Sequence, residues 1–154
     1  MARSAADDRK RQGIPARKSR VRSASGPSTS EMAFAGAGFV TDFIDQAGII
    51  DVDRVADAFR MTKGQLAETV GLAAATVSKA ERRTAPRTQS RMLEMLEIVS
   101  RIREWAGGET QAMAWYRSQP IPALDGRTPE ALVKAGEAGA VRDYLDHLAL
   151  GGYA

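Results

Sequence analysis

The spacing of apolar residues constrains the fold of this 154-residue chain more than any other feature of its sequence. From residue 51 onward, apolar side chains recur every three or four positions, which is the period of an α-helix. Glycine and proline interrupt this pattern at intervals that are typical of helix ends. No segment alternates between apolar and polar residues for long enough to indicate a strand. We therefore expect an all-α fold.

Capping residues place the first expected helices. Asp51 or Asp53 can cap a helix that buries Val55, Ala56 and Phe59, and Thr62 can cap a second helix that ends at Gly71. A third helix is expected over about 73–83, burying Val77. Pro86 begins a longer helix, because proline is favoured at the first helical position. The apolar stripe expected on that helix consists of Met92, Leu93, Leu96, Val99, Ile102 and Trp105.

Glycine and proline also divide the C-terminal third of the chain. The pair Gly107–Gly108 ends the long helix, and Pro120 ends the next one, which carries Trp115 and Tyr116. Those two aromatic residues are expected in the core or in a dimer interface. A further helix is expected to have Thr128 as its cap and Pro129 as its first residue. Gly136 and Gly139 are expected to interrupt the chain before a last amphipathic helix through Leu150.

The composition excludes most catalytic and metal-binding chemistry. There is no cysteine, and His147 is the single histidine, so thiolate or histidine-rich metal sites and a Ser-His-Asp triad are not expected. No apolar run has the length of a membrane span, and the N-terminus lacks the apolar stretch of a secretory signal. We expect a cytoplasmic protein that is not an enzyme and that has no cofactor and no membrane association.

The net charge of +3 conceals a marked segregation of charge. Residues 1–30 carry +6, residues 31–59 carry −5, residues 60–91 carry +5 and residues 92–154 carry −3. A chain that contacts an anionic polymer with only part of itself has this kind of distribution. The expected organisation is a disordered basic tail at 1–30, a helical region at 31–106 and a C-terminal domain at 109–154.

The segment 62–81, TKGQLAETVGLAAATVSKAE, predicts a DNA-binding helix-turn-helix, which we place at residues 62–83. Ala67 provides the small side chain that a steep helix crossing needs, Gly71 provides the turn, and Leu72 and Val77 anchor the second helix. The opposite face would then enter the major groove. The alternative is an ordinary helical hairpin with a solvated basic face. The candidate DNA-binding residues are Lys63, Ala74, Thr76, Ser78, Lys79, Arg82 and Arg83, and Arg87 is a further candidate for phosphate contact.

The run Thr76-Val77-Ser78-Lys79 resembles the end of the Xre/Cro-type helix-turn-helix pattern. Ala73 stands where such proteins usually have a serine N-cap, a loss that costs about 1 kcal/mol of helix stability. Because Ala74 and Ala75 are short for reading bases, specificity is expected to depend on few side chains or on DNA shape.

The C-terminal segment resembles the toxin-binding domain of the Xre/MbcA/ParS antitoxins, the partners of RES-domain toxins. The resemblance rests on Trp115-Tyr116, on the run Leu124-Asp125-Gly126-Arg127-Thr128-Pro129, and on Leu132, Gly139, Val141 and the ending Gly151-Gly152-Tyr153-Ala154. It implies a small helical domain that occludes the NAD cleft of a toxin that degrades NAD or transfers ADP-ribose. Arg127 is either a structural residue that ties down carbonyls of its own loop or a toxin contact.

The last four residues are candidate toxin-binding residues together with Arg127. Gly151 and Gly152 followed by the aromatic ring of Tyr153 and the carboxylate of Ala154 form a flexible probe that can enter a pocket. The alternative is a frayed chain end. The resemblance places Tyr153 in part of the toxin's NAD cleft.

The sequence as a whole favours an antitoxin. Its expected partners are a RES-domain toxin and double-stranded operator DNA, which it would bind to autoregulate its operon as a homodimer within a hetero-oligomeric complex. The alternative is a stand-alone helix-turn-helix transcriptional regulator whose C-terminal domain dimerises or senses a ligand.

Overall fold

The computed structural model describes residues 38–152, and the tail predicted at 1–30 lies outside that range. The described residues form an all-α fold, as predicted, apart from two isolated antiparallel bridges, Ile44 with Ile50 and Ile121 with Arg127. After a helical turn at 38–41, the elements are α2 (Val52–Ala58), α3 (Lys63–Thr69), α4 (Ala74–Ser78), α5 (Ala80–Arg83), α6 (Pro86–Ala106), α7 (Glu109–Ser118), a 3₁₀ turn (Pro122–Leu124), α8 (Pro129–Ala135) and α9 (Ala138–Ala149).

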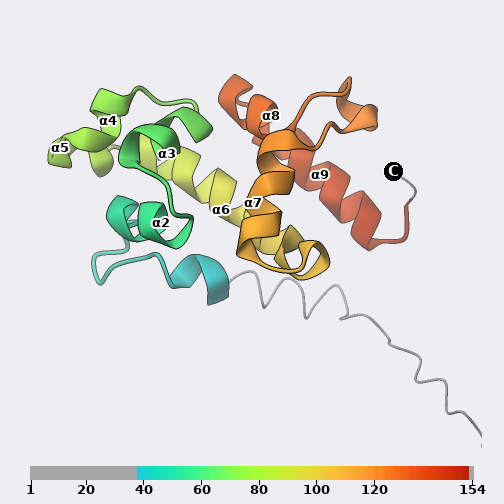
Figure 1. Cartoon of the computed structure of the whole chain (residues 1–154), viewed down its shortest axis with the longest axis horizontal. Coiled ribbons are helices and arrows are strands. Elements are labelled where there is room, and N and C mark those ends of the chain that lie inside the picture. Colours follow the sequence, from blue (N-terminus) through green and yellow to red (C-terminus); the bar gives the residue numbers. More distant parts are fainter. Residues whose placement is uncertain (1–37, 153–154) are drawn as a thin grey trace, which may run out of the picture.

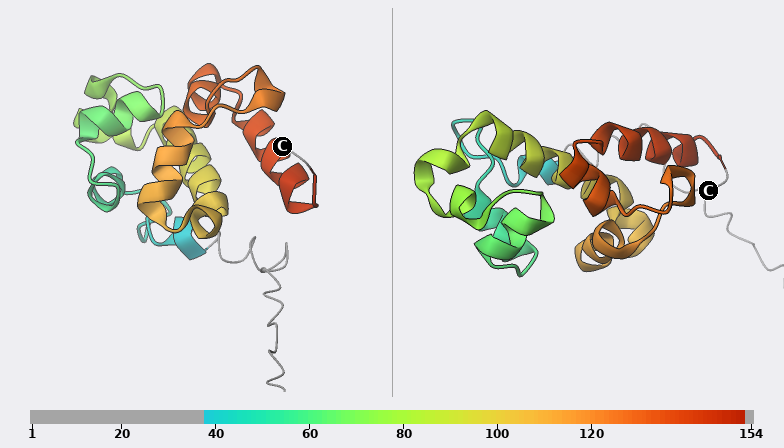
Figure 2. Two further views of the ribbon diagram at one scale, coloured as in Figure 1. Left: turned by 45° about the vertical axis from the view of Figure 1, so that its right-hand side comes forward. Right: turned by 90° about the horizontal axis from the view of Figure 1, so that it is seen from above.

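The long helix α6 forms the axis of the molecule (Figure 1). Helices α2 to α5 gather at its N-terminal end, while α7, α8 and α9 pack against the remainder (Figures 1 and 2). The reversal between α6 and α7 uses Gly107 and Gly108 at φ +89° and +131°, so that α7 returns along α6. The group α2 to α5 and the group α7 to α9 therefore pack against the same central helix, α6.

The capping predictions are confirmed for three helices. The Asp51 carboxylate accepts hydrogen bonds from the backbone N–H groups of Asp53 and Arg54 at the start of α2. Thr62 and Gln65 form a reciprocal capping box at the start of α3. Thr128 caps α8, with Pro129 as its first residue. These ends form as expected because each cap and its target lie within three residues in the sequence.

Two predictions for the later helices are wrong. Leu93 and Trp105 were expected in the buried stripe of α6, but their side chains are 37% and 47% exposed, since each lies to one side of the row formed by Met92, Leu96 and Val99. Gly139 does not interrupt the chain, because it is the second residue of α9. The αL glycine that ends α8 is Gly136 alone.

The hydrophobic core is continuous from one end of the described chain to the other. It includes Leu66 of α3, Val77 of α4, Tyr116 of α7 and Leu145 of α9, each of which is almost completely buried. Ion pairs across the surface join α6 to α9, Arg101 to Asp146 among them. The regions predicted as separate segments at 31–106 and 109–154 thus pack on a common core, and their boundary as functional domains stays a prediction.

Candidate functional site

The first candidate site is the unit formed by α3, its following turn and α4. The turn residue Gly71 has φ +72°, and the N–H of Leu72 donates to the carbonyl of Ala67 at 2.8 Å, which closes the end of α3. Ala67 and Val77 are fully buried where the two helices meet. The side chains that the sequence selected as anchors therefore hold this unit against the core.

The outward face of α4 carries short side chains. Ala74 and Ser78 are exposed and Thr76 is half-buried. The Ser78 hydroxyl donates to the carbonyl of Ala74 at 2.9 Å, so it is engaged within its own helix. Ala73 provides no side-chain cap, as expected from its methyl group. This face offers few groups that reach far from the backbone.

The prediction of one helix over 73–83 is wrong, because Lys79 is extended (φ −93°, ψ +124°) and divides it into α4 and α5. The Arg83 guanidinium donates to the carbonyl of Val77 at 2.6 Å and to that of Ser78 at 3.4 Å. In a continuous helix those two carbonyls would accept backbone N–H groups four residues later. The side chain of Arg83 thus takes the place of the missing backbone donors.

Two of the candidate phosphate-binding cations converge on one carboxylate. Lys63 lies 2.5 Å from Asp53, and Arg83 lies 2.8 Å from the other oxygen of the same carboxylate. The hydrogen bond from Lys63 and the neighbouring charge of Arg83 lower the pKa of Asp53 below its ordinary value. Asp53 of α2 therefore neutralises part of the +5 block, an interaction between residues too distant in sequence to be predicted by pattern.

The remaining candidate DNA-binding cations are exposed. Lys79, Arg82 and Arg87 make no ion pair with any residue in the range 38–152. Lys79 lies at the break between α4 and α5, Arg82 lies in α5, and Arg87 is the second residue of α6. These three side chains are available to an external anion.

The second candidate site is the C-terminal module, which comprises α7, α8, α9 and the loop between α7 and α8. Hydrogen bonds from the Ile121 N–H to the Arg127 carbonyl and from the Gly126 N–H to the Ile121 carbonyl close this loop. The Arg127 guanidinium pairs with both carboxylate oxygens of Glu137, at 2.7 and 2.9 Å. These bonds lower the pKa of Glu137 below its ordinary value. The expectation that Arg127 ties down carbonyls of its own loop is therefore corrected: it joins the loop to the start of α9.

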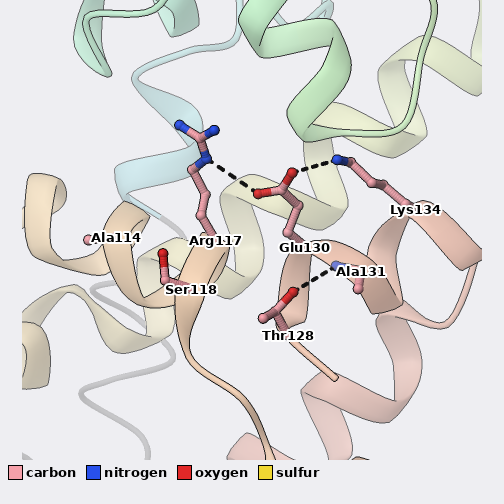
Figure 3. A pocket seen from close by; sticks show the side chains of 7 residues that line it. All are labelled: Ala114, Arg117, Ser118, Thr128, Glu130, Ala131 and Lys134. Carbon is pink, nitrogen blue, oxygen red and sulfur yellow. Dashed lines mark hydrogen bonds and ion pairs between the residues drawn. The ribbon is translucent and has the colours of Figure 1, made fainter. Parts of the chain in front are cut away.

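A shallow groove of about 580 Å³ lies between α7 and α8 (Figure 3). Glu130 stands in it between Arg117, at 3.3 Å, and Lys134, at 2.5 Å (Figure 3). Only 14% of the Glu130 side chain is exposed, and its carboxylate forms ion pairs with both cations. This groove was not expected from the sequence. The four-residue spacing of Glu130 and Lys134 within a helix was the one signal for it.

The C-terminal module lies directly against the α3–α4 turn. A Cβ atom at Gly71 would lie 3.0 Å from Cγ and 3.1 Å from Cα of Lys134, so α8 approaches the turn as closely as glycine permits. The buried Tyr116 hydroxyl donates to the carbonyl of Thr69 at the end of α3, at 3.3 Å. Burial raises the pKa of Tyr116 above its ordinary range. The two candidate sites are thus joined by backbone packing and by a buried hydrogen bond.

The chain leaves α9 through a defined turn. The Gly151 N–H donates to the Leu148 carbonyl and the Gly152 N–H donates to the His147 carbonyl, both at 3.0 Å, while Gly151 has φ +86°. This is the Schellman arrangement of a helix end. The expectation that both glycines act as a flexible spacer is therefore corrected. Tyr153 and Ala154 lie outside the described residues.

Within the described chain, none of the helices has both the length and the apolar character needed to cross a membrane. Residues 102–151, from the end of α6 through Gly151, match a family described as the antitoxin Xre/MbcA/ParS C-terminal toxin-binding domain. No curated protein and no solved structure matches the chain. The match supports an antitoxin role and a toxin as protein partner, and it does not extend to the α3–α4 unit.

Proposed function

We propose that this chain is an antitoxin that neutralises a RES-domain toxin through its C-terminal module. The match of residues 102–151 to a toxin-binding domain carries this proposal. At the end of α9 the side chain of Leu150 is 80% exposed, so it is available to a partner there. In this mechanism the segment that follows α9 enters the toxin's NAD cleft, with Tyr153 as its principal contact. Arg127 acts by holding the loop before α8 against Glu137.

Neutralisation is tested by co-expression with the protein encoded beside this chain's gene. We expect the full chain to restore growth, and a chain that ends at Leu150 to fail although it remains folded by circular dichroism. Growth restored equally by the shortened chain would refute insertion of the segment after α9. Absence of any complex between the full-length proteins would refute the toxin pairing itself.

We further propose that the α3–α4 unit binds operator DNA. Lys79, Arg82 and Arg87 support this, since they are exposed and unpaired within the described chain and lie on three consecutive segments. Thr76 and Lys79 are the side chains best suited to reach base edges, whereas Lys63 and Arg83 are engaged by Asp53. Few side chains then discriminate between base pairs, and electrostatic attraction to the phosphates provides most of the affinity for DNA.

The double substitution K79A/R82A tests this proposal. It removes the base-edge contact of Lys79 and the phosphate contact of Arg82, so the magnitude of the slope of log K against log salt should decrease by about 1 for a duplex taken from upstream of the gene. The control R54A/R117A removes equal charge from α2 and α7 and should leave the slope unchanged. An unchanged slope for K79A/R82A would contradict this placement of the DNA-binding surface. Toxin binding by K79A/R82A should equal that of the natural chain.

A further inference from the structure

The turn that ends α9 determines the direction in which the chain continues. Its two backbone hydrogen bonds, from Gly151 to Leu148 and from Gly152 to His147, satisfy carbonyls that a helix end otherwise leaves unpaired. Gly151 needs the left-handed conformation, whereas nothing surrounds it, because a Cβ there would meet no atom within 4 Å. Its requirement for glycine is therefore purely one of backbone angle.

Gly152 has a different requirement. A Cβ at this position would overlap the ring of His147, so the ring occupies the space that a side chain at 152 would need. The histidine lies in the last turn of α9, and its neighbour Asp146 is paired with Arg101 of α6 at 2.5 Å. The turn is thus attached through α9 to the central helix of the fold.

An apolar side chain beside this turn is exposed and available to a partner. Leu150 is 80% exposed, and it directly precedes the two glycines. By contrast Leu145, on the inner face of the same helix, is 2% exposed. An apolar side chain displayed beside a turn of fixed direction is an arrangement that lowers the entropy lost when a partner binds.

We propose that Gly151 and His147 are positioning residues that pre-organise the segment following α9 for insertion into the toxin. This inference rests on the proposed function of that segment. The glycines act through a fixed turn, with Gly151 setting the backbone direction and the His147 ring packing over Gly152. Leu150 is then exposed beside the turn at the end of α9.

Semisynthesis of the full chain tests the role of Gly151. Because the sequence contains no cysteine, residues 149–154 can be ligated through a temporary cysteine at 149 and desulfurised to the natural alanine without affecting other residues. Three proteins are compared, with glycine, L-alanine or D-alanine at 151. D-alanine accepts a positive φ, whereas L-alanine in that region incurs a penalty that corresponds to about a tenfold change in an equilibrium constant.

The expected result is an affinity for the neighbouring gene's protein that falls about tenfold with L-alanine and stays within about twofold with D-alanine. The variant G48A is the matched control, since Gly48 also has a positive φ with open space around it but belongs to the loop before α2. It should leave affinity unchanged. Suppose that deletion of 151–154 abolishes binding but the proteins with glycine, L-alanine and D-alanine at 151 bind the toxin equally well. That result would overturn pre-organisation and leave the proposed function of the segment intact. A deletion without effect would overturn the proposed function of the segment and this inference with it.

A measurement on the free protein gives an independent result. In NMR spectra the amide protons of Gly151 and Gly152 should show the small temperature coefficients of hydrogen-bonded groups, and D-alanine at 151 should preserve them. Coefficients typical of solvated amides in the natural chain would overturn the inference without any toxin present.

A double-mutant cycle tests the contact between His147 and Gly152. If the ring packing positions the segment, H147A and G152A should each weaken toxin binding about threefold, and the double variant should be no weaker than either. Both single changes displace the same ring from the same place, which is the reason for non-additivity. If the two losses of affinity instead multiply, the double variant binds the toxin about ninefold more weakly. The two residues would then act separately, and the role of His147 would be overturned.

Discussion

The substitution G71A should destabilise the fold for two separable reasons. The first is conformational, since Gly71 has φ +72° and an L-alanine in that region costs about 1–2 kcal/mol. The second is steric, because the new Cβ would lie 3.0–3.3 Å from atoms of Lys134. One of these atoms is the Cα of Lys134, which belongs to the backbone of α8. Side-chain rotation cannot move that atom, so relief requires the turn and α8 to separate. Crowding of this kind costs about 1–3 kcal/mol.

The control G48A isolates the steric part. Gly48 has a similar φ of +78°, but a Cβ at this position would meet no atom within 4 Å, so only the conformational cost applies. We expect G71A to lose about 2–5 kcal/mol and G48A about 1–2 kcal/mol of unfolding free energy. The two variants differ by the crowding cost of about 1–3 kcal/mol, so at about 4 °C per kcal/mol their melting temperatures should differ by about 4–12 °C.

Urea unfolding followed by circular dichroism at 222 nm measures both variants against the natural chain. The slopes of free energy against urea should agree, so that differences in midpoint report stability. Equal losses for G71A and G48A would refute the reasoning, since they would show that α8 does not press against the turn. A larger loss for G71A would support direct packing between the two candidate sites.

Three further outcomes follow from the contacts described. G139A should stabilise the chain by about 0.5–1 kcal/mol in urea unfolding, because Gly139 lies in α9 with open space around it; a loss of stability would contradict its helical placement. Y116F should cost about 1 kcal/mol by leaving the buried carbonyl of Thr69 unpaired, and a neutral effect would show that this bond is not formed. The Asp53 pKa is lowered in the folded chain, so the stabilisation from its carboxylate is complete above the unfolded value and is lost as pH falls through the folded one. D53N should abolish this loss of stability at low pH, and an unchanged pH profile of unfolding would contradict the pairing. Because the substitution also frees Lys63, it should strengthen DNA binding at low salt.

Features that depend on neighbours in sequence were predictable. The caps at Thr62 and Thr128 and the helix ends at Gly71 and Gly136 are found where the sequence placed them. In each case the hydrogen bonds that define the feature join residues within about five positions. Their stability is decided locally, so a pattern of residue types is sufficient to identify them.

Contacts between distant segments were not predictable. The break at Lys79 accompanies a side chain, Arg83, that binds the carbonyl of Val77 and a carboxylate thirty positions away on α2. Periodicity alone favoured a continuous helix there. The same limit applies to the groove around Glu130, whose partner Arg117 belongs to another helix.

Gly71 and Gly152 show the division most clearly. The sequence by itself places a glycine at each of these positions, and at Gly71 the backbone has a positive φ that other residues resist. Only the tertiary structure decided that α8 presses on the first and that the ring of His147 covers the second. Such close approaches depend on how whole helices settle on the shared core around α6, and that arrangement is a sum over contacts along the entire chain, which no short segment of sequence contains.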